Sequence, residues 1–335
     1  MDNLRKILFP LALLYYCITQ LRNYFYSKGW FKSTTYDFPV IGIGNLSMGG
    51  TGKSPMTEYI IRLLNNNYAL ATLSRGYGRK TSGFLEVDAN DSAGQVGDEP
   101  LQFARKFPKV KVAVDENRRQ GIKLLGNSEP KPQIIILDDV FQHRKVKPSF
   151  MVLLTSYKNI FYNDYLLPAG NLRESRTGAN RADCVVVTKC SKFITETEQF
   201  KIREKIKKYT SAPVFFSFID YSENVLGSEN LLLEELKNKD LTVVTGIANP
   251  QPFLDYLKEK GLDYSHLQYK DHHNFTPDEI NKLNECSSIL TTEKDYVRLQ
   301  KQITKAEIFY LPIQFSFVEK GQAFDHAIQE FVKSF

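Results

Sequence analysis

The sequence predicts an α/β fold in which a doubly wound parallel sheet is joined to a second, smaller α/β unit. Short apolar runs rich in β-branched residues recur along the chain and alternate with segments of helical periodicity, as in parallel sheets covered by helices on both faces. The clearest runs are residues 40–43, 69–73, 133–137, 150–154, 184–188, 241–245 and 288–292. With 335 residues, 42% of them apolar and 24% charged, the chain is long enough for two domains.

The first apolar run leads into a glycine-rich loop, which a helical pattern follows. The loop consists of Ser47, Met48, Gly49, Gly50, Thr51, Gly52, Lys53 and Ser54. Glycines let backbone N–H groups turn toward a polyanion, Lys53 can reach the β- and γ-phosphates, and the Ser54 hydroxyl can ligate Mg²⁺. The usual pattern has Gly where Ser47 stands. We predict a P-loop NTPase-like core that binds ATP and Mg²⁺ and transfers a phosphoryl group; the alternative is a chance glycine-rich turn.

Two acids follow the apolar run at residues 133–137. Asp138 and Asp139 would emerge at the carboxyl end of a buried parallel strand, where a nucleotide sits in such folds. An Asp at this place supports the Mg²⁺ that bridges the phosphates. The alternative is an ordinary loop or helix cap. Together with the glycine-rich loop, the pair indicates metal support, without deciding which Asp is the direct ligand.

Charge and cysteine content limit the partners. The net charge of +6 is not gathered into a basic tail, so we expect no nucleic acid partner, whereas anionic small molecules and anionic lipid fit equally well. The four cysteines show neither metal-ligand nor CxxC spacing, which indicates reduced thiols in a cytoplasmic setting.

The segment before the first strand is apolar and aromatic with cationic flanks. Its uninterrupted apolar core, residues 7–18, falls short of the roughly 20 residues that span a bilayer. No small-residue cleavage site follows it, which argues against a signal peptide. We therefore predict, for residues 1–34, a membrane-associated helix lying at the interface, with cationic side chains near the headgroups. The alternative is a helix packed on the soluble body.

Two further segments carry polar groups toward the predicted nucleotide edge. Residues 74–80 form a basic, glycine-containing loop, suited to an anionic substrate or equally to a solvated turn. Farther on, Asp98 precedes a helical pattern, with Glu99 and Pro100 placed in its first turn. From the residue types alone, Asp98 is predicted to be an N-cap.

The second half of the chain begins a new strand–turn–helix unit, so we divide the chain into residues 1–34, a core domain over 35–222 and a smaller α/β domain over 223–335. His272 and His273 lie on a loop before a predicted capping box, in which Thr276 caps a helix with Pro277 at its first position. In such a place a histidine is usually a surface hydrogen-bonding group. Residues 188–191 lack the Asp of a guanine-reading motif, which weakens a GTPase interpretation.

Taken together, the motifs resemble those of the tetraacyldisaccharide 4'-kinase family, the lipid A 4'-kinases of Gram-negative bacteria. The resemblance covers nearly the whole chain. It rests on the aromatic N-terminal segment and on residues 44–47, 49–55, 74–78, 97–100, 138–143, 167–170, 271–273 and 292–295. The family commonly has Thr or Ser at the position of Ser47. It usually has Gly at the position of Val140, which leaves the local backbone geometry open.

This resemblance implies ATP-dependent phosphorylation of the 4'-hydroxyl of an acylated glucosamine disaccharide 1-phosphate, which gives a lipid A precursor. It also implies an active site between the two domains and a peripheral or monotopic place on the cytoplasmic face of the inner membrane. By position, Asp98 matches the family's general base, His272 its histidine partner, and Asp138 and Asp139 the acids that support Mg²⁺. A carboxylate near the acceptor is chemically reasonable because a sugar hydroxyl is a poor nucleophile.

Other classes of protein share some of these features. A P-loop ATPase or GTPase acting as a switch or metallochaperone would share the loop and the Asp pair, but would hydrolyse nucleotide instead of modifying a lipid. A non-enzymatic membrane adaptor with a degenerate loop is disfavoured because Lys53, Ser54 and both acids are intact. Adding the lipid disaccharide and looking for a phosphorylated product separates these classes.

Overall fold

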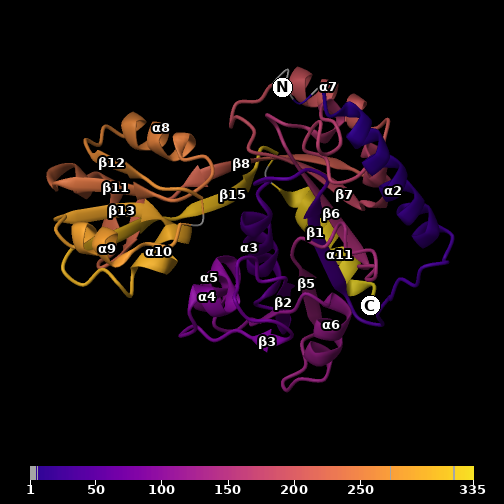
Figure 1. Ribbon diagram of the computed structural model, residues 1–335, viewed down its shortest axis with the longest axis horizontal. Coiled ribbons are helices and arrows are strands. Elements are labelled where there is room, and N and C mark those ends of the chain that lie inside the picture. Colours follow the sequence, from indigo (N-terminus) through magenta and orange to yellow (C-terminus); the bar gives the residue numbers. More distant parts are fainter. Residues whose placement is uncertain (1–4, 6, 272, 320) are drawn as a thin grey trace.

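The chain forms two α/β units, each built on its own sheet (Figure 1). In the computed structural model the described residues are 5, 7–271, 273–319 and 321–335. Within them, the larger unit contains a nine-stranded sheet and the smaller unit a six-stranded sheet. The prediction of an α/β fold with large parallel sheets is confirmed.

The larger sheet has the strand order β15-β8-β7-β6-β1-β5-β2-β4-β3. Neighbouring strands from β8 to β4 pair in parallel, and the two edge strands, β15 and β3, are antiparallel. Strand β1 is central and carries the glycine-rich loop at its carboxyl end. The strands are β1 Val40–Asn45, β2 Leu70–Ser74, β3 Leu85–Glu86, β4 Lys111–Val114, β5 Ile134–Leu137, β6 Phe150–Ser156, β7 Cys184–Thr188, β8 Val214–Tyr221 and β15 Ile313–Phe317.

Helices cover both faces of the larger sheet, as its apolar strands require. Residues of α3, α5 and α11 join one buried core, and residues of α6 and α7 join another. The helices in the described part of the chain include α2 Phe9–Ser27, α3 Lys53–Leu64, α4 Ala93–Val96, α5 Asp98–Lys106, α6 Arg118–Gly126, α7 Glu196–Ile206, α8 Gln251–Glu259, α9 Pro277–Leu283, α10 Glu293–Leu299 and α11 Gln322–Lys333. Short 3₁₀ helices occur at Phe161–Asn163, Arg176–Arg181 and Leu233–Asn238.

The smaller sheet has the order β10-β9-β14-β13-β11-β12, with parallel pairing from β14 to β12. Two apolar clusters lie within this unit, one including residues of α8 and the other residues of α9. Its strands are β9 Asn224–Gly227, β10 Leu231–Leu232, β11 Leu241–Thr245, β12 Ser265–Gln268, β13 Ser288–Thr292 and β14 Glu307–Leu311.

The chain passes between the two units twice, and the two passages lie side by side. After β14 the chain returns, and β15 pairs with β8 so that Ile313 lies opposite Tyr221. Helix α11 then packs into the core of the larger unit through Phe324 and Ile328. The last segment, although within the predicted range 223–335, therefore belongs to the larger sheet.

Helix α2 lies along the side of the larger unit away from the smaller one (Figure 1). Polar contacts attach it: the Tyr15 hydroxyl donates to the carbonyl of Arg173, Asn23 donates to Glu174 and accepts from Arg144, and Arg22 donates to the carbonyl of Gln142. Leu11, Leu14, Ile18 and Leu21 are each more than half exposed. Their spacing places them on one stripe of the helix. Within the described part of the chain, no helix has both the length and the apolar character to cross a bilayer.

The backbones of β1 and of the loop after β5 approach closely at Gly44. A Cβ added to Gly44 would lie 2.6 Å from Phe141 Cβ and 2.9 Å from its backbone nitrogen. Because both partners are fixed near the backbone, the added atom cannot be accommodated by a side-chain rotation. This contact holds the start of the glycine-rich loop beside the Asp138–Asp139 loop.

We predict that Gly44→Ala destabilises the protein by about 1–3 kcal/mol, the usual cost of overpacking a well-packed site. Gly126→Ala is the matched control, since an added Cβ there meets nothing within 4 Å. Urea unfolding followed by circular dichroism measures both. Equal midpoints for the two variants would contradict the close packing at Gly44.

Candidate active site

The glycine-rich loop connects β1 to α3, as the sequence predicted. Gly49 and Gly52 have φ of 101° and 86°, conformations that favour glycine, and Gly52 is the N-cap of α3. Two side chains from the end of β7 hold the loop carbonyls: the Thr188 hydroxyl donates to Thr51 over 2.8 Å, and Lys189 Nζ donates to Gly50 over 2.7 Å. The loop is thus fixed at the N-terminus of a helix, where the helix dipole favours a phosphate group.

Lys53 and Asp139 face each other across this site, with Lys53 Nζ 3.7 Å from Asp139 Oδ1. Arg173 donates to both oxygens of the same carboxylate, over 2.8 Å and 3.2 Å. Burial raises the pKa of Asp139, but the hydrogen bond from Arg173 and the charge of Lys53 outweigh it and hold this pKa below its ordinary value. The positive φ of this segment, 48°, falls on Asp139. Val140 therefore fits at a position where the family usually has Gly.

Asp138 is buried, and its Oδ1 has no hydrogen-bond partner among the residues that the structure describes. Burial, together with the neighbouring charge of Glu99, raises the pKa of Asp138 to about 7. An orphaned carboxylate oxygen and the Ser54 hydroxyl are hard oxygen donors of the kind that Mg²⁺ takes from proteins when phosphates and water complete its shell. The described residues hold no cluster of three His, Cys, Asp or Glu side chains that would form an all-protein metal site.

Glu99, in α5 of the larger unit, links the glycine-rich loop to the smaller unit. The sequence did not indicate this role. The Ser54 hydroxyl donates to Glu99 Oε1 over 2.6 Å, and Lys294 Nζ donates to the same oxygen over 2.7 Å. Lys294 lies in α10 of the smaller unit, so the Glu99 carboxylate connects Ser54 of the glycine-rich loop to a cation of the smaller unit.

Asp98 is the first residue of α5, and the prediction that it is the N-cap is wrong. Gly97 caps the helix, with φ of 94° and no side-chain hydrogen bond. Gly97 packs on the basic loop, where an added Cβ would lie 3.1 Å from the carbonyl oxygen of Tyr77. The Asp98 carboxylate instead pairs with Arg298, whose Nε donates to Oδ1 over 2.8 Å and whose Nη2 donates to Oδ2.

A third contact between α5 and α10 is a buried charge cluster. Lys106 Nζ lies 2.7 Å from a Glu58 oxygen and 2.8 Å from a Glu293 oxygen. Burial raises the pKa of Glu58 to about 7 despite the lowering effect of Lys106. Helix α10 therefore contacts α5 through Glu293, Lys294 and Arg298 in turn.

Of the two predicted histidines, the structure describes His273 alone. His272 lies outside the described residues. His273 stacks on Tyr269, with ring centroids 4.9 Å apart, and its Nε2 lies 2.9 Å from a Glu279 oxygen. The predicted capping box is confirmed, because Thr276 caps α9 with Pro277 at its first position. His273 is thus the surface hydrogen-bonding group that its position suggested.

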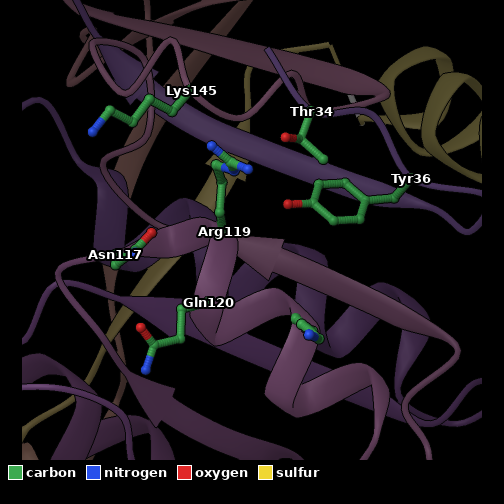
Figure 2. A pocket seen from close by; sticks show the side chains of 7 residues that line it. Thr34, Tyr36, Asn117, Arg119, Gln120 and Lys145 are labelled. Carbon is green, nitrogen blue, oxygen red and sulfur yellow. The ribbon is translucent and has the colours of Figure 1, made fainter. Parts of the chain in front are cut away.

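A separate pocket of about 530 Å³ lies beside α6 (Figure 2). The Tyr36 hydroxyl points toward Arg119 within it. Its lining is cationic and contains no acid: Thr34, Tyr36, Asn117, Arg119, Gln120, Lys123 and Lys145. None of the P-loop residues, Asp98 or the Asp pair lines it, so it is distinct from the candidate nucleotide site.

Comparison with known proteins agrees with this geometry. The family model for Tetraacyldisaccharide-1-P 4'-kinase matches residues 4–333. The chain belongs to this family. A tetraacyldisaccharide 4'-kinase of Flavobacterium johnsoniae is 49% identical over 337 residues, covering 99% of this chain and 98% of the relative, and one of Bacteroides thetaiotaomicron is 40% identical, covering 96% and 91%. A crystal structure of "apo" form LpxK from Aquifex aeolicus in complex with ATP has a TM-score of 0.80 and 33% identity, covering 98% of this chain and 99% of that one.

The structure brings four of the predicted site residues into one region: Lys53, Ser54, Asp138 and Asp139. Glu99 links α5, the helix that begins at Asp98, to this region through its contact with Ser54. Four residues of this region had no predicted role in the sequence: Glu99, Arg173, Lys294 and Arg298. Lys294 lies within the motif at residues 292–295 that carries the family resemblance, and Arg173 lies three positions after the motif at residues 167–170. Their partners lie far away in sequence, so pattern alone could not pair them.

Lys106→Met should cost stability in a pH-dependent way. In the folded protein the pKa of Glu58 is about 7, against an ordinary 4.5, so folding favours the protonated carboxyl group. The contribution of Glu58 to the free energy of unfolding is therefore complete below about pH 4.5 and is lost as the pH rises to about 7. Without Lys106, two buried carboxylates lose their cation, and we expect a loss of about 3–5 kcal/mol at pH 8 and a smaller loss at pH 5.

Urea unfolding at the two pH values measures this difference. Lys109→Met, at an exposed position of the adjoining loop, is the matched control and should change little at either pH. A Lys106→Met penalty that is larger at pH 5 than at pH 8 would show that burial does not govern this cluster.

Proposed function

We propose that this chain is an ATP-dependent kinase that phosphorylates the 4'-hydroxyl of a tetraacyldisaccharide 1-phosphate, giving a lipid A precursor. The observation that carries the proposal is the family match over residues 4–333. The relatives compared above are named tetraacyldisaccharide 4'-kinases. The P-loop between β1 and α3 supplies the geometry that phosphoryl transfer needs, and the related structure was solved in complex with ATP.

Within this proposal the loop N–H groups and Lys53 bind the ATP phosphates. Lys53 offsets the negative charge that grows on the transferred phosphoryl group, and Arg173 and Lys53 keep Asp139 ionised beside it. Ser54 and Asp138 would hold Mg²⁺, with Asp139 in support. When bound there, the ion would supply positive charge that offsets the negative charge of the phosphates.

Asp98 is the proposed general base, with His272 as its partner. Asp98 stands one residue before Glu99, which contacts the P-loop serine, so the carboxylate lies at the boundary between the nucleotide and the smaller unit. There it would accept the proton of the 4'-hydroxyl as the oxygen attacks the γ-phosphorus. The acceptor would approach through the pocket of about 450 Å³ that Asp98 and Arg298 line together with Tyr77 and His273.

A membrane location at the cytoplasmic face of the inner membrane follows from the substrate, whose acyl chains lie in a bilayer. The exposed stripe on α2 supports this location, because its apolar side chains would be buried among lipid chains while Tyr15 and Asn23 keep the helix on the protein. No nucleic acid partner is proposed.

The second candidate class, a P-loop ATPase or GTPase switch or metallochaperone, differs in its product. The test is an assay with radiolabelled ATP and tetraacyldisaccharide 1-phosphate in detergent micelles. Label in the lipid supports the kinase, whereas label released only as inorganic phosphate, at a rate unaffected by the lipid, supports the alternative.

Lys53→Ala should lower the rate of lipid phosphorylation at least about a hundredfold, the cost of losing one electrostatic donor to the transition state. Transfer of label from ATP to lipid at saturating substrates measures it. Lys192→Ala, an exposed lysine outside the loop, is the control. Activity of the Lys53 variant within threefold of wild type would remove this lysine from the catalytic machinery.

Replacing Leu14, Ile18 and Leu21 with Gln should release the protein from membranes, because each apolar side chain buried in lipid contributes about 1.5–3 kcal/mol. This triple variant is preferable to a deletion, since α2 also contacts Arg173 and Glu174. Sedimentation with vesicles measures binding, and the KM for lipid should rise more than that for ATP. Leu124→Gln, an exposed apolar position on α6, is the control.

The result that would oppose this membrane role is a triple variant that still sediments with membranes after a high-salt wash. The exposed stripe would then be a feature of the folded body, and another surface would hold the lipid.

A further inference from the structure

Arg298 of the smaller unit holds the Asp98 carboxylate at two points. Both carboxylate oxygens accept hydrogen bonds from Arg298, Oδ1 from Nε over 2.8 Å and Oδ2 from Nη2. The two side chains are 12% and 8% exposed. The pair therefore lies in a largely water-excluded place, where a two-point contact fixes the plane of the carboxylate.

Arg298 is itself held in place by residues of the smaller unit. Asp295, with no exposed surface, lies with Oδ1 3.6 Å from Arg298 Nη1. Its other oxygen accepts hydrogen bonds from the Gly246 backbone over 2.9 Å and from the Thr292 hydroxyl over 2.8 Å. Gly246 follows β11 and leaves no room for a side chain, since a Cβ there would lie 2.9 Å from Asp295 Oδ1. The end of a buried strand thus sets the position of the guanidinium.

We propose that Arg298 is the positioning residue of Asp98, which orients the carboxylate toward the acceptor hydroxyl from across the boundary between the two units. This inference rests on the proposed function. It adds to that function a residue from the end of α10, so that the base on the larger unit is aligned only when the smaller unit is in place.

The chemistry of the pair suits this role. A carboxylate has about four lone-pair sites, and a two-point contact with one guanidinium uses two of them, so this contact does not itself exclude a hydrogen bond from the acceptor hydroxyl. A guanidinium remains protonated in proteins, so Arg298 cannot take the proton that Asp98 must receive. A nucleophile or base that is held by a third group is the usual arrangement in such sites.

Other groups around Arg298 do not replace this contact. The carbonyl of His273 lies 3.5 Å from Nη1. Burial lowers the pKa of Arg298, but the hydrogen bond and charge of Asp98, followed by the charges of Asp295 and Asp271, raise it above its ordinary value. Lys294, the other cation of α10 near α5, forms its ion pair with Glu99. Loss of Arg298 would remove both of these hydrogen bonds from the Asp98 carboxylate.

A double-mutant cycle tests the inference. The full-length protein is assayed as wild type, Arg298→Gln, Asp98→Asn and the double variant, with kcat and both KM values measured in lipid micelles. We expect Arg298→Gln to lower kcat about 10- to 100-fold, the scale of a small misplacement of a reacting group, and to leave the KM for ATP within twofold. In the Asp98→Asn background the same change should cost less than twofold, because the residue acts through Asp98.

Two further variants separate positioning from folding. Arg298→Lys, which keeps the charge but cannot form the two-point contact, should recover part of the lost kcat. Lys305→Gln, at an exposed position of the loop between α10 and β14 and outside this pocket, should stay within twofold of wild type. ATP affinity measured for every variant shows that the nucleotide site is folded.

The inference is overturned if Arg298→Gln lowers kcat by the same factor in both backgrounds, which indicates a structural role, or if it leaves kcat unchanged. It is also overturned if Asp98→Asn alone keeps full activity, although the kinase function then stands. Failure of the proposed function looks different, since the wild-type protein would then transfer no label to the lipid.

Discussion

The contact between the start of α5 and α10 is the constraint on which this site depends. Two consecutive acids at the first turn of α5 serve different partners. Glu99 accepts from the P-loop serine and from Lys294, while Asp98 accepts from Arg298. Because α5 belongs to the larger unit and α10 to the smaller one, the nucleotide loop and the proposed base are joined by one turn of helix, and the opposite unit supplies both counter-charges.

These ion pairs fix the geometry of the site and add little to the stability of the fold. Burying paired charges gains little net free energy, since desolvation offsets their attraction, whereas removing one partner is costly. Stability of the arrangement comes instead from the apolar cores and from the double passage of the chain, in which β15 pairs with β8 and α11 joins the core of the larger unit. The two units are thus tethered side by side, and the charged contacts set how α10 meets α5.

Much of this fold could be predicted from local pattern. The apolar runs gave the principal parallel strands, the glycine-rich loop gave the β1–α3 junction, and the Thr276 capping box gave the start of α9. The prediction that Asp98 is an N-cap was wrong. Gly97, which packs on the loop at Tyr77, is the cap, and Asp98 is the first residue of the helix. Arg298 could not be paired with Asp98 from the sequence, since 200 positions separate them and only the three-dimensional packing of the two units brings them together.

The most direct measurement of this constraint is hydrogen exchange of α5 and α10 by mass spectrometry, followed across low concentrations of urea. If the charged contacts lock the two helices together, the peptides covering Asp98–Lys106 and Glu293–Leu299 should open with one common free energy and one common urea dependence, although they belong to different sheets. The contradicting result is that α10 opens with the strands of the smaller sheet while α5 keeps the protection of the larger one.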